Sequence, residues 1–564
     1  MAYKGTATAA RLACTLVFAG MSACGAGQIS TDSATSTTTP AATPTAAPTA
    51  APTTAPTTTP ATTPTATPTA TATPAASPNT DASSATSPAT SSLVTNFNNG
   101  DACVAQTLPS TSILFGSSKK VFAHYFFPYP VSLDNAAPAN DYYNRNYLSK
   151  TGESSKWIAQ GGLLRQRPLG RTPTSNAAWL QLNMEAEIKA AMARGITGFA
   201  FDVMSVAEAT GSNSPLQRLL AAALAVDSRF KIMVMPDISA LRGDSSAVVQ
   251  IIASVASSPT AYRLSDGRLV SSAFDAGLNS AAWWTSVLSQ LNAKGINVAF
   301  VPVFLGWQGS VETFAPISYG ISDWGTATAA SASAMQADPD IIQSTYGKIF
   351  MMPIDPQQYR PKDFAYWEAG NSAAFRNAWM SAITGDTDWV QLVTWNDFSE
   401  SSQISPYTDA TLRGDIGTGY YDMNAFYAAW FLTGQKPTIT HDVLYYFYRR
   451  EPGTAAGPAQ SQLDTNVTHT VENDIELVAF LTAPGTLKIM IGGKTYTQSA
   501  PAGITSLKIP AQPGVPLFTL SRSGTDVFSF VGGVQIYGLS GIPSGVQDLT
   551  YWSGSAAKSG ICRL

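Results

Sequence analysis

The feature that most constrains this chain is a repeated alternation of short apolar runs with segments of helical periodicity, which extends from Lys119 to Trp395. Strands separated by helices pair in parallel, and eight such strands close into a barrel. We therefore predict a (β/α)8 barrel rather than an open doubly wound sheet. The runs are Val121–Phe127, Gly198–Val203, Lys231–Met235, Leu269–Phe274, Asn297–Phe304, Tyr319–Ile321, Lys348–Met352 and Trp389–Trp395.

The segments between the runs carry helix signals of their own. Ala177–Arg194 places apolar residues on one face at helical spacing. Ser214 followed by Pro215 is typical of the start of a helix, which we expect to continue to Val226. Gly195 and Gly295 follow near-identical helix ends and lead straight into predicted strands, as glycine caps do.

Polar and aromatic side chains follow most of the predicted strands. In a barrel of this kind, functional residues lie just beyond the carboxyl ends of the strands. Aspartates there can also cap the next helix, and tryptophans can be ordinary packing, but only 12% of the chain is charged, so capping alone does not explain the whole set. The residues that we expect to contact substrate are His124, Tyr125, Asp202, Asp237, Asp275, Trp307, Asp323 and Trp324, together with Trp395 and Asn396 after the last strand.

The last strand is followed by two carboxylates three positions apart, Asp397 and Glu400. Two carboxyl groups that flank a glycosidic bond suffice to hydrolyse it, one as acid and one as base or nucleophile. Trp395 offers a flat face to a sugar ring, and Asn396 offers hydrogen bonds to hydroxyls. The alternative is that Asp397 caps a following helix and Glu400 completes a capping box.

The string from Trp395 to Ser401, Trp-Asn-Asp-Phe-Ser-Glu-Ser, resembles the Trp-Asn-Asp-Tyr-Gly-Glu-Ser motif of glycoside hydrolase family 71, the endo-α-1,3-glucanases or mutanases. Phe398 and Ser399 are the departures. The resemblance continues at Gly195–Asp202, where the family commonly has Asn in place of Asp202, and at Tyr445–Pro452.

This resemblance implies an inverting hydrolase that cleaves α-1,3-glucosidic bonds within a glucan, with Asp397 and Glu400 as the acid–base pair and without a cofactor. It also implies that His124 contacts sugar and that a β-sandwich follows the barrel. A hydrolase of a different α-glycan on the same scaffold, or a wall glycan-binding protein without activity, stays open as an alternative.

Beyond Pro452 the apolar pattern changes to period two. Short strands separated by turn residues predict an antiparallel β-sandwich that either buttresses the barrel or binds sugar. The expected strands are Ile475–Leu481, Leu487–Ile491, Ile504–Ile509, Leu517–Leu520 and Val527–Val531.

The start of the chain reads as an export signal, with a weakly basic beginning, a short apolar run and small residues near Ala23. Met21–Cys24 resembles a lipobox, which predicts lipidation of Cys24 and a membrane anchor; ordinary cleavage near Ala23–Ala26 is the alternative.

Gln28–Ser92 is almost entirely Ser, Thr, Ala and Pro and reads as a tether. We expect an extracellular or cell-surface protein, divided as signal 1–24, linker 25–115, barrel 116–452 and sandwich 453–564.

The two cysteines outside the export region, Cys103 and Cys562, are predicted to pair, with unlinked thiols as the alternative. The chain has three histidines and no Cys-His spacing typical of a metal site. The net charge is −4, so the chain lacks the excess of basic residues that is typical of proteins that bind nucleic acid. The resemblance implies a polysaccharide substrate, an α-glucan, as the partner, and we expect a monomer.

Overall fold

The computed structural model describes residues 103–325, 327–409, 416–457, 460–461, 471–542 and 545–562. The predicted export signal, the lipidation site Cys24 and the tether lie outside these residues. Within the described part of the chain, no helix is both long enough and apolar enough to cross a membrane.

Eight parallel strands form a closed barrel, in the order β1-β11-β8-β7-β6-β5-β4-β3. The predicted (β/α)8 architecture is thus confirmed, although the last strand is shorter than expected and ends at Leu392. The strands are β1 (Lys120–Phe126), β3 (Gly198–Val203), β4 (Lys231–Pro236), β5 (Leu269–Ala273), β6 (Val298–Phe304), β7 (Gly320–Asp323), β8 (Ile349–Ile354) and β11 (Trp389–Leu392).

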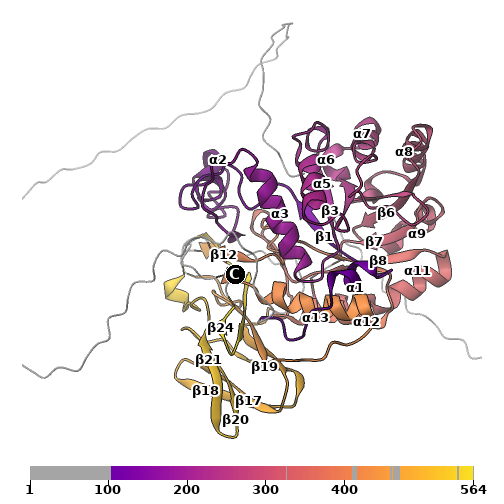
Figure 1. Cartoon of the computed structure of the whole chain (residues 1–564). Helices are drawn as coiled ribbons and strands as arrows, with labels where there is room; N and C mark the ends of the chain where they lie inside the picture. Colours follow the sequence, from indigo (N-terminus) through magenta and orange to yellow (C-terminus); the bar gives the residue numbers. More distant parts are fainter. Residues whose placement is uncertain are drawn as a thin grey trace, which may run out of the picture. The chain divides into compact units, whose positions relative to one another are not determined.

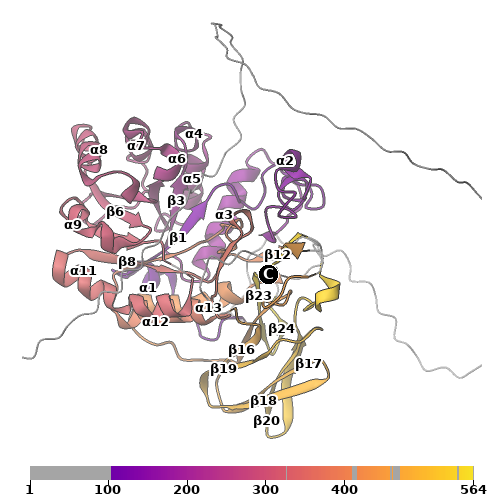
Figure 2. The same ribbon diagram turned by 180° about the vertical axis from the view of Figure 1, so that it is seen from behind.

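Helices surround the strands in both views (Figures 1 and 2). The longer ones are α3 (Trp179–Met192), α5 (Pro215–Val226), α7 (Ser245–Ser254), α8 (Ala281–Ala293), α11 (Asp338–Tyr346), α12 (Ala373–Thr384) and α13 (Gly419–Thr433). The expected start of α5 is present, because the Ser214 hydroxyl accepts a hydrogen bond from the Gln217 amide. Gly195 has the positive φ of a helix cap, and a Cβ there would lie 2.9 Å from the Ala428 Cβ on α13.

Short elements occupy the connections. They are α1 (Thr111–Gly116), η2 (Tyr143–Tyr147), α2 (Gly152–Ser155), β2 (Gln166–Pro168), α4 (Val206–Ala209), α6 (Ile238–Leu241), η3 (Ala276–Leu278), η4 (Trp307–Gly309), α9 (Val311–Phe314), η5 (Ala315–Ile317), α10 (Ala329–Ala334), η6 (Met335–Ala337), β9 (Gln358–Arg360), η7 (Pro361–Asp363), β10 (Ala365–Trp367), β12 (Tyr407–Asp409), β13 (Ile416–Gly417), β15 (Gln460–Ser461), η8 (Leu539–Gly541) and β22 (Gly545–Val546).

The two faces of the barrel strands belong to different apolar clusters. Phe122 packs inside the barrel with Met233 and Met351, whereas Ala123 and Tyr125 pack with the surrounding helices. Because side chains alternate along a strand, His124 shares the inward face with Phe122.

The C-terminal region contains two antiparallel sheets whose side chains join in one apolar cluster, with Leu477 from one sheet and Leu487 and Phe518 from the other. The first sheet consists of β19 (Gly503–Pro510), β16 (Asp474–Leu481), β14 (Val443–Arg449), β23 (Tyr551–Ala557) and β24 (Gly560–Ile561). The second consists of β18 (Lys494–Ala500), β17 (Gly485–Ile491), β20 (Leu517–Arg522) and β21 (Thr525–Val531). Strand β14, which the sequence analysis placed in the barrel, belongs to the first of these sheets.

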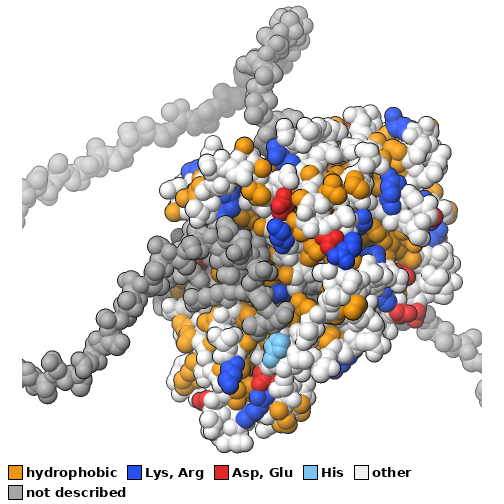
Figure 3. Space-filling view, in the orientation of Figure 1, with side chains coloured by type: hydrophobic (Ala, Val, Ile, Leu, Met, Phe, Trp, Pro, Cys, Tyr) orange, Lys and Arg blue, Asp and Glu red, His pale blue; other side chains and the backbone are white. Residues whose placement is uncertain are grey.

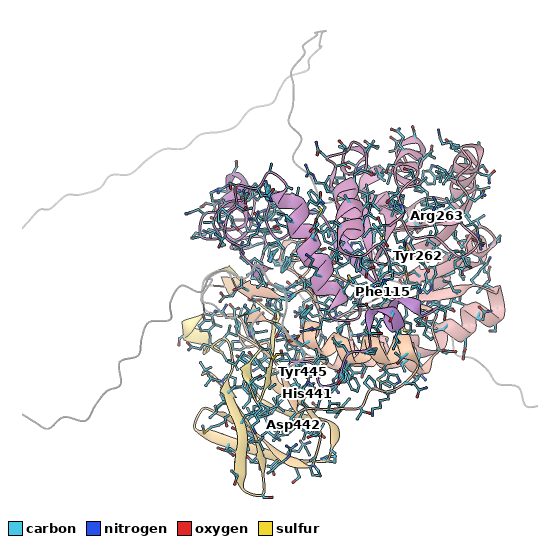
Figure 4. The ribbon with its side chains drawn as sticks, in the orientation of Figure 1. Phe115, Tyr262, Arg263, His441, Asp442 and Tyr445 are labelled. Atoms are coloured by element: carbon cyan, nitrogen blue, oxygen red, sulfur yellow. A yellow bond between two sulfur atoms is a disulfide. The ribbon has the colours of Figure 1, made fainter. Side chains whose placement is uncertain are left out.

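Covalent and polar contacts connect the C-terminal sheets to the barrel. The structure contains the expected Cys103–Cys562 disulfide. Tyr445, labelled in Figure 4 beside His441 and Asp442, donates a hydrogen bond from its hydroxyl to the Cys103 carbonyl, 3.4 Å away. Arg449 on β14 forms a buried ion pair with Glu368 in the loop after β10, at 3.0 Å.

The face of the molecule shown in Figure 3 carries scattered charges of both signs among neutral side chains.

Candidate active site

The loop that follows β11 is held in place by hydrogen bonds from its own backbone and from a neighbouring strand end. The Thr394 amide donates to the Ser402 carbonyl at 2.9 Å, and the Asp397 amide donates to the Thr394 hydroxyl at 2.7 Å. Asn396 Oδ1 accepts from the Phe126 amide at 2.7 Å, which fixes the loop to the end of β1. The loop therefore presents Asp397 and Glu400 from a rigid frame at the carboxyl end of the barrel.

Asp397 is buried, and its two carboxylate oxygens have different roles. Oδ1 accepts hydrogen bonds from the amide and hydroxyl of Ser399 and from the Glu400 amide, at 2.8–3.1 Å. This oxygen thus stabilises a turn and not a helix: within the described residues no helix follows Asp397 before α13, and Glu400 bonds Arg360 instead of completing a capping box. Burial raises the pKa of Asp397, and the Glu400 carboxylate adds to this rise, while Lys362 and the hydrogen bonds oppose it.

Glu400 is ion-paired through Oε2. The Arg360 guanidinium on β9 lies 2.9 Å from this oxygen, and the Gln358 side-chain amide lies 3.4 Å from it. The carboxylate is 14% exposed. Of the two predicted catalytic carboxyls, one is therefore enclosed by hydrogen-bond donors of its own loop and the other faces a cation from a different loop.

His124 and Asp202 form a buried pair, with His124 Nε2 lying 3.2 Å from Asp202 Oδ2. Burial lowers the pKa of His124 to about 4, although Asp397, Glu400 and Asp237 each act to raise it. Burial also raises the pKa of Asp202 well above its usual range, and Asp237 adds to the effect. Burial thus opposes the charged form of both partners, and these couplings bring five of the predicted residues into one site.

Aromatic rings form a wall beside this pair. The ring centroids of Trp324 and His124 are 4.8 Å apart, edge to face, and Phe274 meets Trp324 at the same separation. Next to Phe274, Asp275 has its pKa raised to about 6 by burial and by Asp237. Trp324 and Asp275 thus lie on the same side of the barrel as the acidic cluster.

Three aromatic residues predicted to contact sugar instead pack against the helices, and those predictions are wrong. Tyr125 is fully buried and donates from its hydroxyl to Glu187 Oε2 on α3 at 2.8 Å. Trp395 is likewise fully buried in the outer apolar cluster. Trp307 lies in the same cluster and donates from its ring nitrogen to Asp338 at 3.2 Å.

Asn396 and Asp323 lie near the strand ends but bond to the protein backbone. The Asn396 amide group donates to the Phe126 and Tyr129 carbonyls, both at 3.0 Å, in addition to accepting from β1. Asp323 accepts from the amides of Gly306, Trp307 and Trp324 at 2.8–3.3 Å. Both side chains thus hold the backbone at the mouth of the barrel, and their predicted contact with sugar stays a prediction.

Arg360 and Asp355 are site residues that the predicted set lacks. Asp355 follows β8, is buried, and neither of its carboxylate oxygens finds a hydrogen-bond partner among the described residues. Burial raises its pKa well above the usual range, with further contributions from Asp323 and Glu400. An arginine shortly after a predicted strand, in a chain with few charges, was the available signal for Arg360.

A cavity of about 790 Å³ lies along α3 and is lined by residues such as Arg171, Trp179 and Asn183, not by the carboxylates described above. Within the described residues, one cluster has the spacing of metal ligands: Cys103, Asp422 and Cys562. Its cysteines are joined as a disulfide, so their sulfurs are not available as thiolate ligands.

The chain is similar to known glycoside hydrolases in sequence and in fold. Over 372 residues the chain is 26% identical to "Glucan endo-1,3-alpha-glucosidase agn1" of Schizosaccharomyces pombe, covering 62% of this chain and 86% of that protein. It is 22% identical to "Mutanase Pc12g07500" of Penicillium rubens, covering 62% and 80%. A solved GH99 endo-alpha-mannosidase from Bacteroides thetaiotaomicron aligns with a TM-score of 0.41 at 13% identity, covering 55% of this chain and 97% of that one. The sequence model described as Glycosyl hydrolase family 71 matches residues 174–563, more than half of the chain, and the chain therefore belongs to that family.

Proposed function

We propose that this protein is an exported hydrolase that cleaves α-1,3-glucosidic bonds within a glucan and inverts the anomeric configuration. The observation that carries the proposal is the pair Asp397 and Glu400 at the carboxyl end of the last barrel strand, in a chain of this family. The names of the relatives, a glucan endo-1,3-alpha-glucosidase and a mutanase, supply the linkage.

In the proposed reaction one carboxyl protonates the glycosidic oxygen as the bond from that oxygen to C1 breaks. The other carboxylate takes a proton from a water molecule, whose oxygen forms the new bond to C1 from the opposite face. The resting enzyme must then hold one carboxyl protonated and one ionised. The different surroundings of Asp397 and Glu400 supply such an asymmetry.

The substrate and stereochemistry are tested with a panel of insoluble α-1,3-glucan, β-1,3-glucan, starch and α-mannan. We expect new reducing ends from α-1,3-glucan alone, oligosaccharide products early in the reaction, and β-anomers as the first species seen by NMR. Release from another polysaccharide would overturn the linkage, and α-anomers would overturn inversion.

The catalytic pair is tested with Asp397→Asn and Glu400→Gln. Each should lower kcat by about 10²–10⁴-fold, because general acid–base catalysis contributes on that scale. Asp340→Asn and Glu312→Gln, at exposed positions on α11 and α9, are the matched controls and should keep parental activity. Parental activity in either catalytic variant would refute its assignment, and glucan binding without hydrolysis by the parent would favour a binding protein.

We also propose that Cys24 anchors the protein to a membrane. The full chain, expressed in a bacterial host, should partition into detergent, and Cys24→Ala should shift it to the aqueous phase. Cys14→Ala, within the same leader, is the control. A parent chain in the aqueous phase would support ordinary signal cleavage instead.

A further inference from the structure

A hairpin formed by β9, η7 and β10 follows barrel strand β8 and rests on the catalytic loop. Its strands pair antiparallel, with Arg360 opposite Ala365 and Gln358 opposite Trp367. The Tyr359 amide donates to the Glu400 carbonyl at 2.8 Å. The hairpin is thus attached to the backbone of Glu400 itself.

Arg360 reaches from this hairpin to the carboxylate of Glu400. The guanidinium Nη2 lies 2.9 Å from Glu400 Oε2, and both side chains are about 85% buried, with exposures of 15% and 14%. The guanidinium carbon also lies 5.0 Å from the ring centroid of Trp367 on the other strand of the hairpin. An arginine held on an aromatic ring is already oriented for its ion pair, so less side-chain entropy is lost when the pair forms.

Glu400 also interacts electrostatically with His124 and with three buried carboxyl groups, none of which supplies a positive charge near pH 7. Asp397 comes from the same loop, Asp355 from the end of β8, Asp202 from β3, and the neutral His124 from β1. The second cation near the pair, Lys362, also belongs to the hairpin and lowers the pKa of Asp397. Both catalytic carboxyls therefore face positive charge from one structural element.

We propose that the hairpin Gln358–Trp367 is a cationic clamp on the catalytic pair, in which Arg360 is a positioning residue that fixes the side chain and charge of Glu400. The inference rests on the proposed function, because it assigns Glu400 to the reaction. Arg360 acts through Glu400 rather than on the reacting atoms.

The clamp predicts a definite change in the pH profile. Removing a cation beside a carboxylate favours its protonated form, so the limb of kcat/KM that depends on this carboxyl moves to higher pH. If Glu400 is the base, the acidic limb moves; if it is the acid, the alkaline limb moves. The direction is the same in both cases, and the limb that moves identifies the role of Glu400.

The experiment compares the full mature protein with Arg360→Gln, Arg360→Lys and the control Arg268→Gln. Arg268 is paired with Asp266 at 2.8 Å on the surface, so its loss removes the same charge away from the site. We expect Arg360→Gln to lower kcat about 10- to 100-fold with a smaller change in KM, and to move one limb upward by about one pH unit. Arg360→Lys should return that limb toward its parental position, and Arg268→Gln should leave the profile unchanged.

A second measurement does not need activity. Thermal unfolding of Arg360→Gln, Glu400→Gln and the double variant forms a double-mutant cycle. If the ion pair positions Glu400, the shift in Tm of the double variant differs from the sum of the shifts of the two single variants. Additive shifts, or an unmoved pH profile in Arg360→Gln, would overturn the clamp. If the parent cleaves a different glycan, the linkage is wrong, yet the same profiles measured on that glycan still decide the clamp.

Discussion

His124 and Tyr125 show at the scale of single residues what the sequence could and could not predict. Both stand at the end of the first strand, where polar residues were expected to meet substrate. The alternation of side chains sends His124 into the barrel and Tyr125 toward α3. Counting alternate positions from the inward-facing Phe122 would have placed His124 inside the barrel and Tyr125 outside it. Trp395 lies beyond the end of its strand, so its outward position depends on the turn and could not be found by such counting.

Trp324 and Trp307 provide a matched test of this distinction. Trp324→Phe should lower kcat/KM about three- to tenfold, because it removes part of the aromatic wall beside His124. Trp307→Phe should lower Tm without changing kcat/KM, because it removes packing and a hydrogen bond in the helix layer. Steady-state kinetics and thermal unfolding of both variants check this, and the opposite pattern would place the substrate elsewhere.

Glu187 should make the stability of the protein depend on pH, and replacing this residue should remove that dependence. Burial raises the pKa of Glu187 to about 8, so the folded state keeps its proton where the unfolded chain has lost it. The unfolded state then binds fewer protons between about pH 4.5 and 8, and stability falls as pH rises through this window.

Glu187→Gln lacks this titration. Its stability relative to the parent should therefore increase with pH, by a few kcal/mol between about pH 4.5 and 8. Urea unfolding at a series of pH values measures the difference. A difference that is constant with pH would show that Glu187 is already ionised in the folded protein.

At the scale of elements, strands with a clear apolar pattern were the predictable ones. The barrel strands are apolar runs that are buried on both faces, and β16, β17, β19, β20 and β21 are short apolar strands between turn residues; all were predicted within a few residues. Strand β18 (Lys-Thr-Tyr-Thr-Gln-Ser-Ala) is polar because it lies at the edge of its sheet. Strand β23 is rich in Ser, Gly and Ala because large neighbours fill its space: a Cβ on Gly554 would lie 2.3 Å from the Tyr446 ring.

The loop after β11 depends on Asn396 for its attachment to β1. Asn396→Ala leaves the Phe126 amide and the Phe126 and Tyr129 carbonyls without this partner. We expect a loss of about 2–4 kcal/mol in unfolding free energy, together with lower kcat, because the same loop carries both carboxyls of the proposed catalytic pair. Asn377→Ala on α12, whose side chain bonds near the surface, is the control and should cost less than about 1 kcal/mol.

At the scale of the molecule, the barrel and the C-terminal sheets share buried polar contacts as well as apolar ones. Arg376 on α12 pairs with the buried Glu476 of β16 at 2.9 Å, and Arg449 pairs with Glu368. Such pairs were beyond prediction from the sequence, because each joins residues some 80 to 100 positions apart. The Cys103–Cys562 pair was predictable because the other two of the four cysteines, Cys14 and Cys24, fall in the predicted export region.

Removing this disulfide should destabilise the protein measurably. The bridge joins positions 459 residues apart, and closing so long a loop restricts the unfolded chain. The double variant Cys103→Ser, Cys562→Ser should lose roughly 2–5 kcal/mol and show a lower Tm, while its kcat at low temperature stays parental. A reductant should lower the Tm of the parent and leave that of the variant unchanged; equal responses would argue against the bridge.

The same bridge closes the chain between Cys103 and Cys562 into a covalent ring. A single cut by a protease in any loop opens the ring into one continuous piece and releases no fragment. Two cuts between Cys103 and Cys562 are needed before β11 can separate from Cys103. A protein exposed to extracellular proteases would thus stay attached and assembled after its first nick, which a reducing gel would reveal and a non-reducing gel would not.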